Sequence, residues 1–549
     1  MKTLRVYDFS LPPLALSLRT GQGKIFYFAL FNMLTKRDQI LISALYLLAC
    51  AWVWPFVRYY VDNPDSFQYI SIAEHIIKGK WQFVFNGYWS PIISWLLAPF
   101  VVLFKDGIDA FKYLQIVIGL FVISQWWKFL SLVNIPLQIK KVIGYACIPF
   151  VVNFALINLT PDLLFVGILL AYIIALVNWL EKKSDGSELG WFGTGLYLTK
   201  SFGLFIFIFL FFIVWRMKGE LIPTYVKKKM IKPLLIVCGG WIILISIHHG
   251  HFTLSESARF NLTYEVAPVK NQIVKLPVLS SGLLPPSNSE AISAWEEPGS
   301  QVQLTPLNPL KDPIHYAKVV ERNIYSIYYS DFRNQFGLLF IISFVLFLFF
   351  RRKENDIPLW IKISLAVIIG MYGGYSLILI HARYVWICSL LFIPMTIYFF
   401  SEVRLMNLAK PTRDIFFVGI IIFSCKRPIK EVLLNGDREV NPLQLYQMIR
   451  SPKESMEIFY RREQELHHDI KIMKKELAEG QNFASIEDDS NERDVYSEGL
   501  MIAYEMKGKY YGVSQNIDSS FTGYVISKSV LDKTLVFEGG KSNLKIYKW

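Results

Sequence analysis

Long apolar runs separated by shorter polar segments dominate the chain up to about residue 425. A helix needs roughly 20 predominantly apolar residues to cross a bilayer, and most of these runs approach that length. The pattern therefore predicts a multi-pass α-helical membrane protein. The runs cover residues 40–57, 91–104, 113–127, 142–159, 162–180, 189–215, 233–248, 335–350, 363–380, 384–400 and 414–425.

Two of the runs decide how the chain is threaded through the membrane. The run 91–104 has 14 residues and begins with Pro91, so we expect it to dip into the outer leaflet without crossing. The run 189–215 is interrupted by Thr199-Lys200-Ser201. A single helix would bury Lys200 near the membrane centre at a cost of about 2.5–3.5 kcal/mol. We therefore expect two short helices, with Lys200 at the external surface between them.

These choices predict about eleven transmembrane helices with the N-terminus in the cytoplasm. The segments then assigned to the cytoplasm contain 24 Lys and Arg in 103 residues, and the external segments contain 14 in 149. Such an excess of basic residues inside is the usual signature of membrane orientation.

The predicted domain plan has three parts. Residues 1–39 form a cytoplasmic segment, in which 24–34 are expected to make an interfacial helix. Residues 40–425 form the transmembrane domain, with external loops at 58–112 and 249–334. The polar residues 426–549 form a small soluble α/β domain, with a charged helix at 453–478 and strands within 521–549. This domain is external if the short run 414–425 crosses the membrane, and cytoplasmic if it does not.

Composition excludes several other classes of protein. Apolar residues make up 53% of the 549-residue chain and charged residues only 18%, which argues against a disordered chain, a collagen or a secreted disulfide scaffold. The five cysteines all lie in or beside apolar runs, so we expect no disulfide framework. The net charge of +13 is accounted for by the cytoplasmic loops, and we expect no nucleic-acid partner.

Polar residues at the ends of the predicted spans gather on the external face. A sugar carried on a lipid phosphate would present its anomeric carbon at such a surface. Transfer of that sugar to a hydroxyl needs a carboxylate to accept the proton and cations to stabilise the phosphate leaving group. The candidates are Asp62 and Asp65 in the first external loop, Asp162 at the start of the fourth span, Lys200 at the next external turn, and His381, Arg383 and Tyr384 at the start of the tenth.

Four short motifs in the same order resemble those of the GT-C glycosyltransferases, a group that includes the protein O-mannosyltransferases and the aminoarabinose transferases of lipid A. The first external loop contains Asp65-Ser66-Phe67-Gln68-Tyr69, Gly79-Lys80-Trp81, Asn86-Gly87-Tyr88 and Pro91. The others are Thr160-Pro161-Asp162, Leu198-Thr199-Lys200, and Arg383-Tyr384 followed by Pro394. The resemblance extends over about residues 65–400 and includes the short helix 91–104.

The resemblance implies a GT-C-like fold and an inverting transfer from a polyprenyl-phosphate sugar to a glycan, lipid or protein acceptor. It implies that Asp65 is the catalytic base, Asp162 a second acid, and Lys200, Arg383, His381 and Tyr384 the phosphate-binding group. It also implies a cell-envelope enzyme in a bacterial inner membrane, surrounded by membrane lipids, with its active site facing the periplasm. Two departures concern the donor: Ser66 stands where many members have glutamate, and Ser90 where the aminoarabinose enzymes have lysine.

Other interpretations of these residues stay open at the sequence level. Asp65 is also a favourable N-cap for a helix that begins at residue 66. Asp62 and Asp162 are candidates for holding a divalent metal ion. His248, His249 and His251 resemble a ligand cluster, although a role at the start of the loop is expected instead. The alternative function is a multi-pass transporter or flippase for a lipid or polar solute, which should place ionisable groups near mid-membrane.

Overall fold

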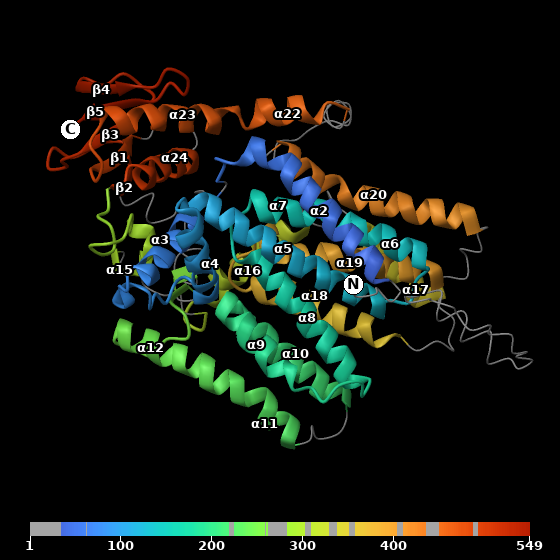
Figure 1. Cartoon of the computed structure of the whole chain (residues 1–549). Coiled ribbons are helices and arrows are strands. Elements are labelled where there is room, and N and C mark those ends of the chain that lie inside the picture. Colours follow the sequence, from blue (N-terminus) through green and yellow to red (C-terminus); the bar gives the residue numbers. More distant parts are fainter. Residues whose placement is uncertain are drawn as a thin grey trace, which may run out of the picture.

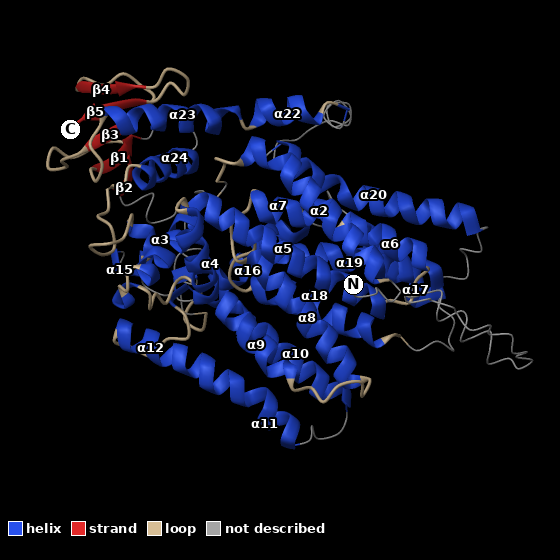
Figure 2. Cartoon of the chain, in the orientation of Figure 1, coloured by secondary structure: helices blue, strands red, loops and turns tan. Residues whose placement is uncertain are grey.

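The computed structural model describes residues 35–61, 63–218, 224–257, 260–261, 283–301, 309–328, 337–350, 357–402, 410–434, 450–486 and 492–549. Its helices lie side by side in a bundle, and a small sheet domain covers one end of that bundle (Figures 1 and 2). The interfacial helix expected at 24–34 lies outside the described residues.

Seven helical segments of the described chain are long and apolar enough to cross a membrane, so the chain is an integral membrane protein. The helices α4, α10 and α17 are apolar but shorter, and the predicted total of eleven spans is not tested by these lengths. The seven are Lys36–Val57 (α2), Gly107–Leu132 (α5), Leu137–Leu156 (α6, Leu137–Ala146, and α7, Ile148–Leu156), Asp162–Leu180 (α8), Lys229–His249, Leu359–Ser376 (α18) and Ala382–Glu402 (α19).

The two runs that decided the threading form the helices predicted for them. The first run is α4, Pro91–Phe104. The second is divided into α9, Glu188–Thr199, and α10, Phe202–Lys218. Lys200 breaks the helix with an extended backbone (φ −150°, ψ 132°). The side chain of Lys200 therefore leaves the helical repeat at the junction between α9 and α10.

The remaining helices of the bundle complete this picture. Residues 224–249 form α11, Thr224–Pro233, a π-helical turn, Leu234–Cys238, and α12, Gly239–His249. Helix α16 covers Pro313–Ile327, and α17 covers Gly337–Phe350. The last apolar run belongs to a longer helix, α20, Lys410–Leu434, which continues through the expected domain boundary at 425–426.

The C-terminal part contains the expected charged helix and a five-stranded sheet. The charged helix is divided at Tyr460 into α22, Pro452–Phe459, and α23, Arg461–Glu476. The sheet has the order β2-β1-β3-β5-β4, in which β1 is parallel to β2 and β3, and β5 is antiparallel to β3 and β4. Its strands are Asn482–Ile486 (β1), Lys509–Ser514 (β2), Tyr524–Ser527 (β3), Thr534–Glu538 (β4) and Lys545–Lys548 (β5), and α24 spans Glu492–Glu505.

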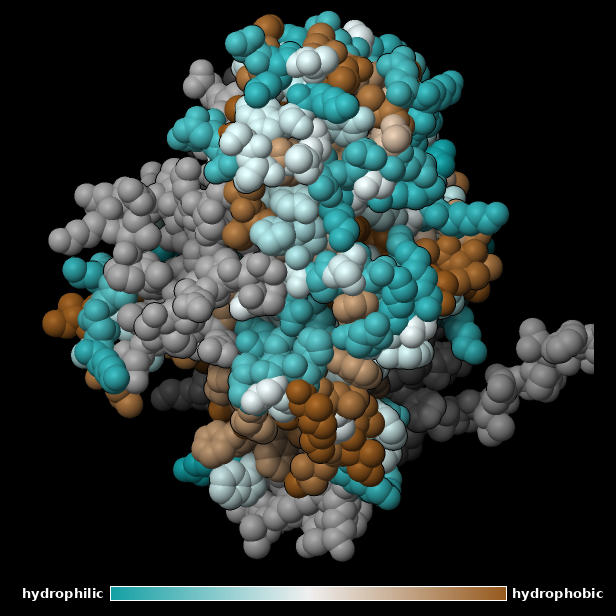
Figure 3. All heavy atoms as spheres, turned by 90° about the vertical axis from the view of Figure 1, so that its left-hand side faces the viewer, coloured by the Kyte–Doolittle hydropathy of each residue, from teal (hydrophilic) through white to brown (hydrophobic). Residues whose placement is uncertain are grey.

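The sheet domain is attached to the segment predicted as a long loop at 249–334, which is called the fourth loop below. The Tyr510 N–H donates to the carbonyl of Ile292 (2.7 Å), and the Leu284 N–H donates to the carbonyl of Tyr511 (2.8 Å). Seen from this end, hydrophilic side chains cover much of the surface, and a hydrophobic patch lies below them on the side where α12 runs (Figures 1 and 3). The sheet domain therefore lies at the same end of the bundle as loop residues 283–297.

Candidate functional site

Two polar groups from distant parts of the chain hold the carboxylate of Asp65, the first residue of α3 (Asp65–Ile77). Arg383, at the start of α19, places its guanidinium 3.0 Å from Oδ2. The indole N–H of Trp295 donates to Oδ1 at 3.0 Å. Asp65 is only 15% exposed, so both contacts are largely shielded from solvent.

A second ion pair joins Asp162 to Lys200. Asp162 is the first residue of α8, and its Oδ1 lies 2.5 Å from the Lys200 ammonium. The hydroxyl of Thr160 donates to the other carboxylate oxygen at 2.7 Å. Asp162 is 4% exposed, so its charge is balanced inside the protein by the lysine.

Tyr384 connects the two ion pairs. The Lys200 ammonium lies 3.8 Å from the centre of the Tyr384 ring, and the Arg383 guanidinium carbon lies 5.3 Å from it. Cations over an aromatic face are attracted by its negative potential. His381 packs edge-on against the same ring at 5.2 Å and is exposed. Six of the seven predicted residues therefore gather at one place.

Asp62 is the seventh, and it lies outside the described residues. The geometry of Asp162 does not support the metal site hypothesised between Asp62 and Asp162. Lys200 contacts one oxygen of the Asp162 carboxylate, and Thr160 donates to the other. Within the described part of the chain, the three-residue group suited to a metal ion lies elsewhere, at His248, His249 and Glu297.

Hydrogen bonds to backbone carbonyls hold the two acid-bearing segments together. The hydroxyl of Ser66 donates to the carbonyl of Leu159 at 2.8 Å, and the Gln115 amide donates to the carbonyl of Thr160 at 2.6 Å. Both side chains are fully buried. Ser66 thus links the start of α3 to the segment that carries Asp162.

The buried Lys112 of α5 fixes the start of the first loop. Its ammonium donates to the carbonyls of Val57 and Tyr60 (2.8 Å for Tyr60). A cation placed on the free carbonyls at a helix C-terminus stabilises that end of the helix. Helix α2 therefore ends at a defined place, immediately before the segment that carries Asp65.

Trp295 and Glu296 were not predicted from the sequence. Glu296 is 1% exposed, and its carboxylate accepts a hydrogen bond from Ser71 (2.6 Å) and contacts the His75 ring (2.9 Å). Its backbone carbonyl accepts from the indole of Trp89 (2.9 Å). Through Ser71 and His75 these bonds hold the fourth loop against α3, and through Trp89 they hold it against the first loop. In this position Trp295 reaches Asp65.

A small polar pocket lies beside this group, between the first loop, the α9–α10 turn and the residues after α12. It includes Ser90, the position at which the aminoarabinose enzymes carry lysine. Ser201 also belongs to it and directly follows Lys200. The lining residues are Gly87, Trp89, Ser90, Tyr197, Ser201, Trp241, Leu254 and Ser255.

Comparisons with known proteins show the fold. No protein-family model and no curated protein matches the chain. The crystal structure of ArnT from Cupriavidus metallidurans in the apo state is similar, with a TM-score of 0.50 and 10% sequence identity over 92% of this chain and 97% of that one. The structure of the same ArnT bound to undecaprenyl phosphate gives a TM-score of 0.49 at the same identity and coverage.

At 10% identity this likeness concerns the fold alone. It confirms the GT-C-like membrane fold that the four motifs predict, and the span of the match includes most of the chain.

Proposed function

We propose that this chain is an inverting glycosyltransferase that moves a sugar from a polyprenyl-phosphate donor to a hydroxyl acceptor at the external face of the membrane. The observation that supports this proposal best is the pair of ion pairs, Asp65 with Arg383 and Asp162 with Lys200, grouped around Tyr384 at one end of a bundle with a GT-C-like fold.

Asp65 is the proposed base. A hydroxyl is a poor nucleophile near neutral pH, and a positioned carboxylate that accepts its proton accelerates such a transfer by about 10²–10⁴-fold. Trp295 and Arg383 each hold one oxygen of Asp65, which limits how the carboxylate can turn. The acceptor hydroxyl would approach this fixed carboxylate from the end of the bundle at which the sheet domain lies.

Lys200 and Arg383 are the proposed partners of the donor phosphate. An arginine can hold two phosphate oxygens at once, whereas a lysine acts as a point charge. Asp65 and Asp162 balance both cations in the absence of donor, which avoids uncompensated positive charge in a poorly solvated place. His381 and Tyr384 border the same group and would complete the phosphate contacts. Asp162 acts as the second acid by orienting Lys200.

The proposal places the protein in a bacterial inner membrane, with this end of the bundle facing the periplasm. The donor's polyprenyl tail would lie among membrane lipids beside the helices. The acceptor would be a glycan, a lipid or a protein with an accessible hydroxyl. The soluble domain at residues 426–549 is proposed as the acceptor-facing cover, because it lies on the loop that contacts Asp65.

The test is turnover of a panel of polyprenyl-phosphate sugars by the purified full-length protein, compared with Asp65→Asn. Asparagine keeps the size of aspartate and an oxygen that can accept from Trp295, but it cannot take the proton. We expect turnover by the wild type and a loss of about 10²–10⁴-fold in the variant, with folding intact.

Glu74→Gln is the matched control, because Glu74 lies on the same helix and pairs with the exposed Lys78. The control should keep wild-type activity. Retention of more than about a tenth of the activity by Asp65→Asn would return Asp65 to the role of a helix-start residue. Turnover of no donor by the wild type, with no lipid bound to it by mass spectrometry, would favour a transporter.

A further inference from the structure

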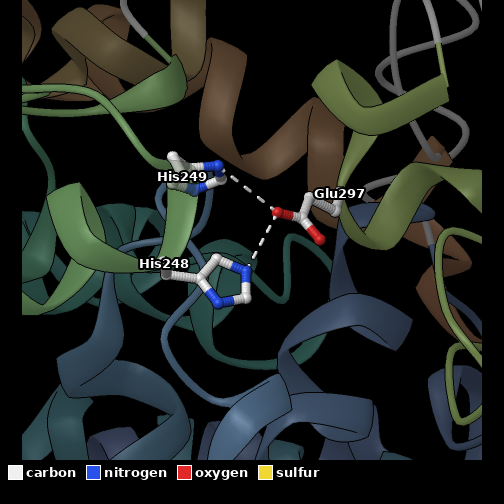
Figure 4. A group of neighbouring side chains, drawn as sticks. All are labelled: His248, His249 and Glu297. Atoms are coloured by element: carbon white, nitrogen blue, oxygen red, sulfur yellow. Dashed lines mark ion pairs between the residues drawn. The ribbon is translucent and has the colours of Figure 1, made fainter.

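Two consecutive histidines at the end of α12 meet a single carboxylate of the fourth loop. His248 Nε2 lies 3.3 Å from Glu297 Oε1, and His249 Nδ1 lies 3.6 Å from the same oxygen. Figure 4 shows the carboxylate between the two rings. Gly250 ends the helix in the left-handed conformation (φ 69°), directly after both histidines. The three side chains are partly shielded, with exposures of 31%, 13% and 17%.

Ion pairing alone is a poor explanation for this arrangement. Two protonated imidazoles would share one oxygen while their ring centres lie 4.9 Å apart, and like charges at that distance repel. Two neutral imidazoles and a carboxylate, by contrast, are a common ligand set for zinc. Adjacent ligands of a tetrahedral zinc ion at about 2.0–2.2 Å lie about 3.3–3.6 Å apart, which matches both distances to Glu297.

We propose that His248, His249 and Glu297 bind one divalent transition-metal ion, with Zn²⁺ as the best fit. Imidazole ligands favour Zn²⁺, Co²⁺ and Ni²⁺ over Mg²⁺ and Ca²⁺, which prefer all-oxygen sites. Within the described residues, this is the group of three that brings suitable ligand atoms together. The proposed metal role is compatible with the loop-start position that the sequence predicts for these histidines, because His248 and His249 end α12 directly before the loop.

The ion would join a membrane helix to the loop that contacts Asp65. Glu297 comes directly after Trp295 and Glu296 in the chain. The Trp295 indole donates a hydrogen bond to Asp65, and the Glu296 carboxylate accepts one from Ser71. On the other side, a side chain at Gly87 would come within 2.7 Å of His249, so the first loop also lies against this group. Any effect of the ion on turnover rests on the proposed function, whereas binding of the ion does not.

The experiment uses the purified full-length protein, stripped of metal by a chelator and exchanged into metal-free buffer. Zn²⁺ is added, and its stoichiometry and affinity are measured by elemental analysis and by competition with a chromophoric chelator. We expect about one Zn²⁺ per chain, not displaced by a large excess of Mg²⁺. Co²⁺ bound in place of Zn²⁺ should give the intense visible absorption of a four-coordinate ion.

Glu297→Gln and His248→Ala should each lower the affinity by at least about tenfold, because the loss of one ligand leaves only two. The matched control is His468→Gln, which removes an exposed histidine from α23. It should bind like the wild type.

A wild type that binds no Zn²⁺, or ligand variants that bind it as tightly as the control, would overturn the proposal. Folding of each variant is checked by size-exclusion chromatography and circular dichroism. If one ligand variant does not fold, the other, together with the Co²⁺ spectrum of the wild type, still decides the question. Because no reading depends on turnover, failure of this site and failure of the proposed function remain distinguishable.

Discussion

Asp65 is held at both carboxylate oxygens by residues that lie 230 and 318 positions away in the chain. Hydrogen bonds to a charged group contribute about 1.5–3 kcal/mol when they are well made, more than bonds between neutral groups. Trp295 therefore has two functions: it fills space among Tyr88, Trp89 and Phe260, and it orients the proposed base.

Trp295→Phe separates these two functions, because phenylalanine keeps an aromatic ring and removes the N–H donor. We expect turnover to fall about tenfold or more, while the dependence on donor concentration stays close to that of the wild type. Steady-state kinetics with the active donor measures both quantities. Trp191→Phe, at a position that is 62% exposed on α9, is the control and should leave both unchanged. A normal rate in Trp295→Phe would limit Trp295 to packing.

At the residue scale, the sequence predicts which residues gather but not how they pair. Asp65, Asp162, Lys200 and Arg383 all lie at helix ends, so charge distribution alone brings them to one membrane face. Which acid meets which cation depends on the lateral order of the helices, for which the sequence has no local signal. Trp295 lies in a polar loop of unpredictable path, so its contact with Asp65 could not be predicted.

At the scale of elements, the turn between α9 and α10 determines where Lys200 lies. A Cβ atom at Gly203 would lie 2.2 Å from the backbone oxygen of Leu196, which no real contact allows. Glycine at this position permits α10 to begin against the end of α9. The helix break predicted from Thr199-Lys200-Ser201 thus also depends on a residue two positions later.

Gly203→Ala should destabilise the protein by about 1–3 kcal/mol, because backbone has to move to admit the methyl group. Thermal unfolding in detergent measures this change. Gly373→Ala is the matched control: it lies within α18, and among the described residues beyond its own helix backbone no atom lies within 4 Å of the added carbon. Alanine is the better helix former there, so the control should unfold at the same temperature or higher. Equal unfolding temperatures for the two variants would contradict the steric argument.

The charged helix α23 buries one of its two neighbouring histidines, His467, and exposes the other, His468. His467 stacks on Tyr59, at the end of α2, with ring centres 3.6 Å apart, and it is 8% exposed. Burial, with a smaller contribution from Lys471, lowers the pKa of His467 to about 4. This contact joins the C-terminal domain to the turn that follows α2.

The low pKa makes this contact sensitive to acid. When the domain is detached, His467 has its ordinary pKa of about 6.5 and is protonated below that pH. In the attached domain the stacked His467 has a pKa of about 4, so it is not protonated until the pH falls that far. Attachment of the domain should therefore weaken as the pH falls from about 6.5 to 4, by at most about tenfold per unit. Limited proteolysis of the domain at pH 7 and pH 5 measures the change.

His467→Phe keeps a stacked ring that does not titrate, so the difference between pH 7 and pH 5 should shrink. His468→Phe changes an exposed neighbour and should retain it. An unchanged pH difference in His467→Phe would assign the sensitivity to other groups.

At the scale of the whole molecule, the sheet domain and the fourth loop lie at one end of the bundle, and the α8–α9 connection lies at the other (Figure 1). All five native cysteines are buried, so single cysteines placed on the surface can be labelled with little background. Ser289, Gln515 and Ser184 are exposed positions suited to this purpose.

With an impermeant thiol reagent applied to intact cells, Ser289→Cys and Gln515→Cys should both react, and Ser184→Cys should react only after the membrane is opened. This result would place the site and the C-terminal domain outside. Reaction of Ser184→Cys alone would reverse the orientation, and reaction of Ser289→Cys without Gln515→Cys would contradict the contact between the two.

The helical architecture could largely be predicted because apolar runs of spanning length are a local property of the sequence. Run 91–104 and the divided run 189–215 were predicted with nearly their observed bounds. The packing of the C-terminal domain on the loop could not be predicted, because it depends on backbone bonds such as that from Tyr510 to Ile292, between residues far apart in sequence. Such pairing leaves no periodic pattern in either segment.

The bond between Tyr510 and Ile292 has a consequence for the order of biosynthesis. A ribosome completes the loop with Trp295 long before it reaches β2, the strand that supports this loop. Contacts of such long range form late, because the intervening chain must first be made and folded. A nascent or truncated chain thus has the acids and cations in the membrane without the support that holds Trp295 in place. The loop that carries Trp295 therefore gains this backbone support only after β2, within the last forty or so residues, has been made.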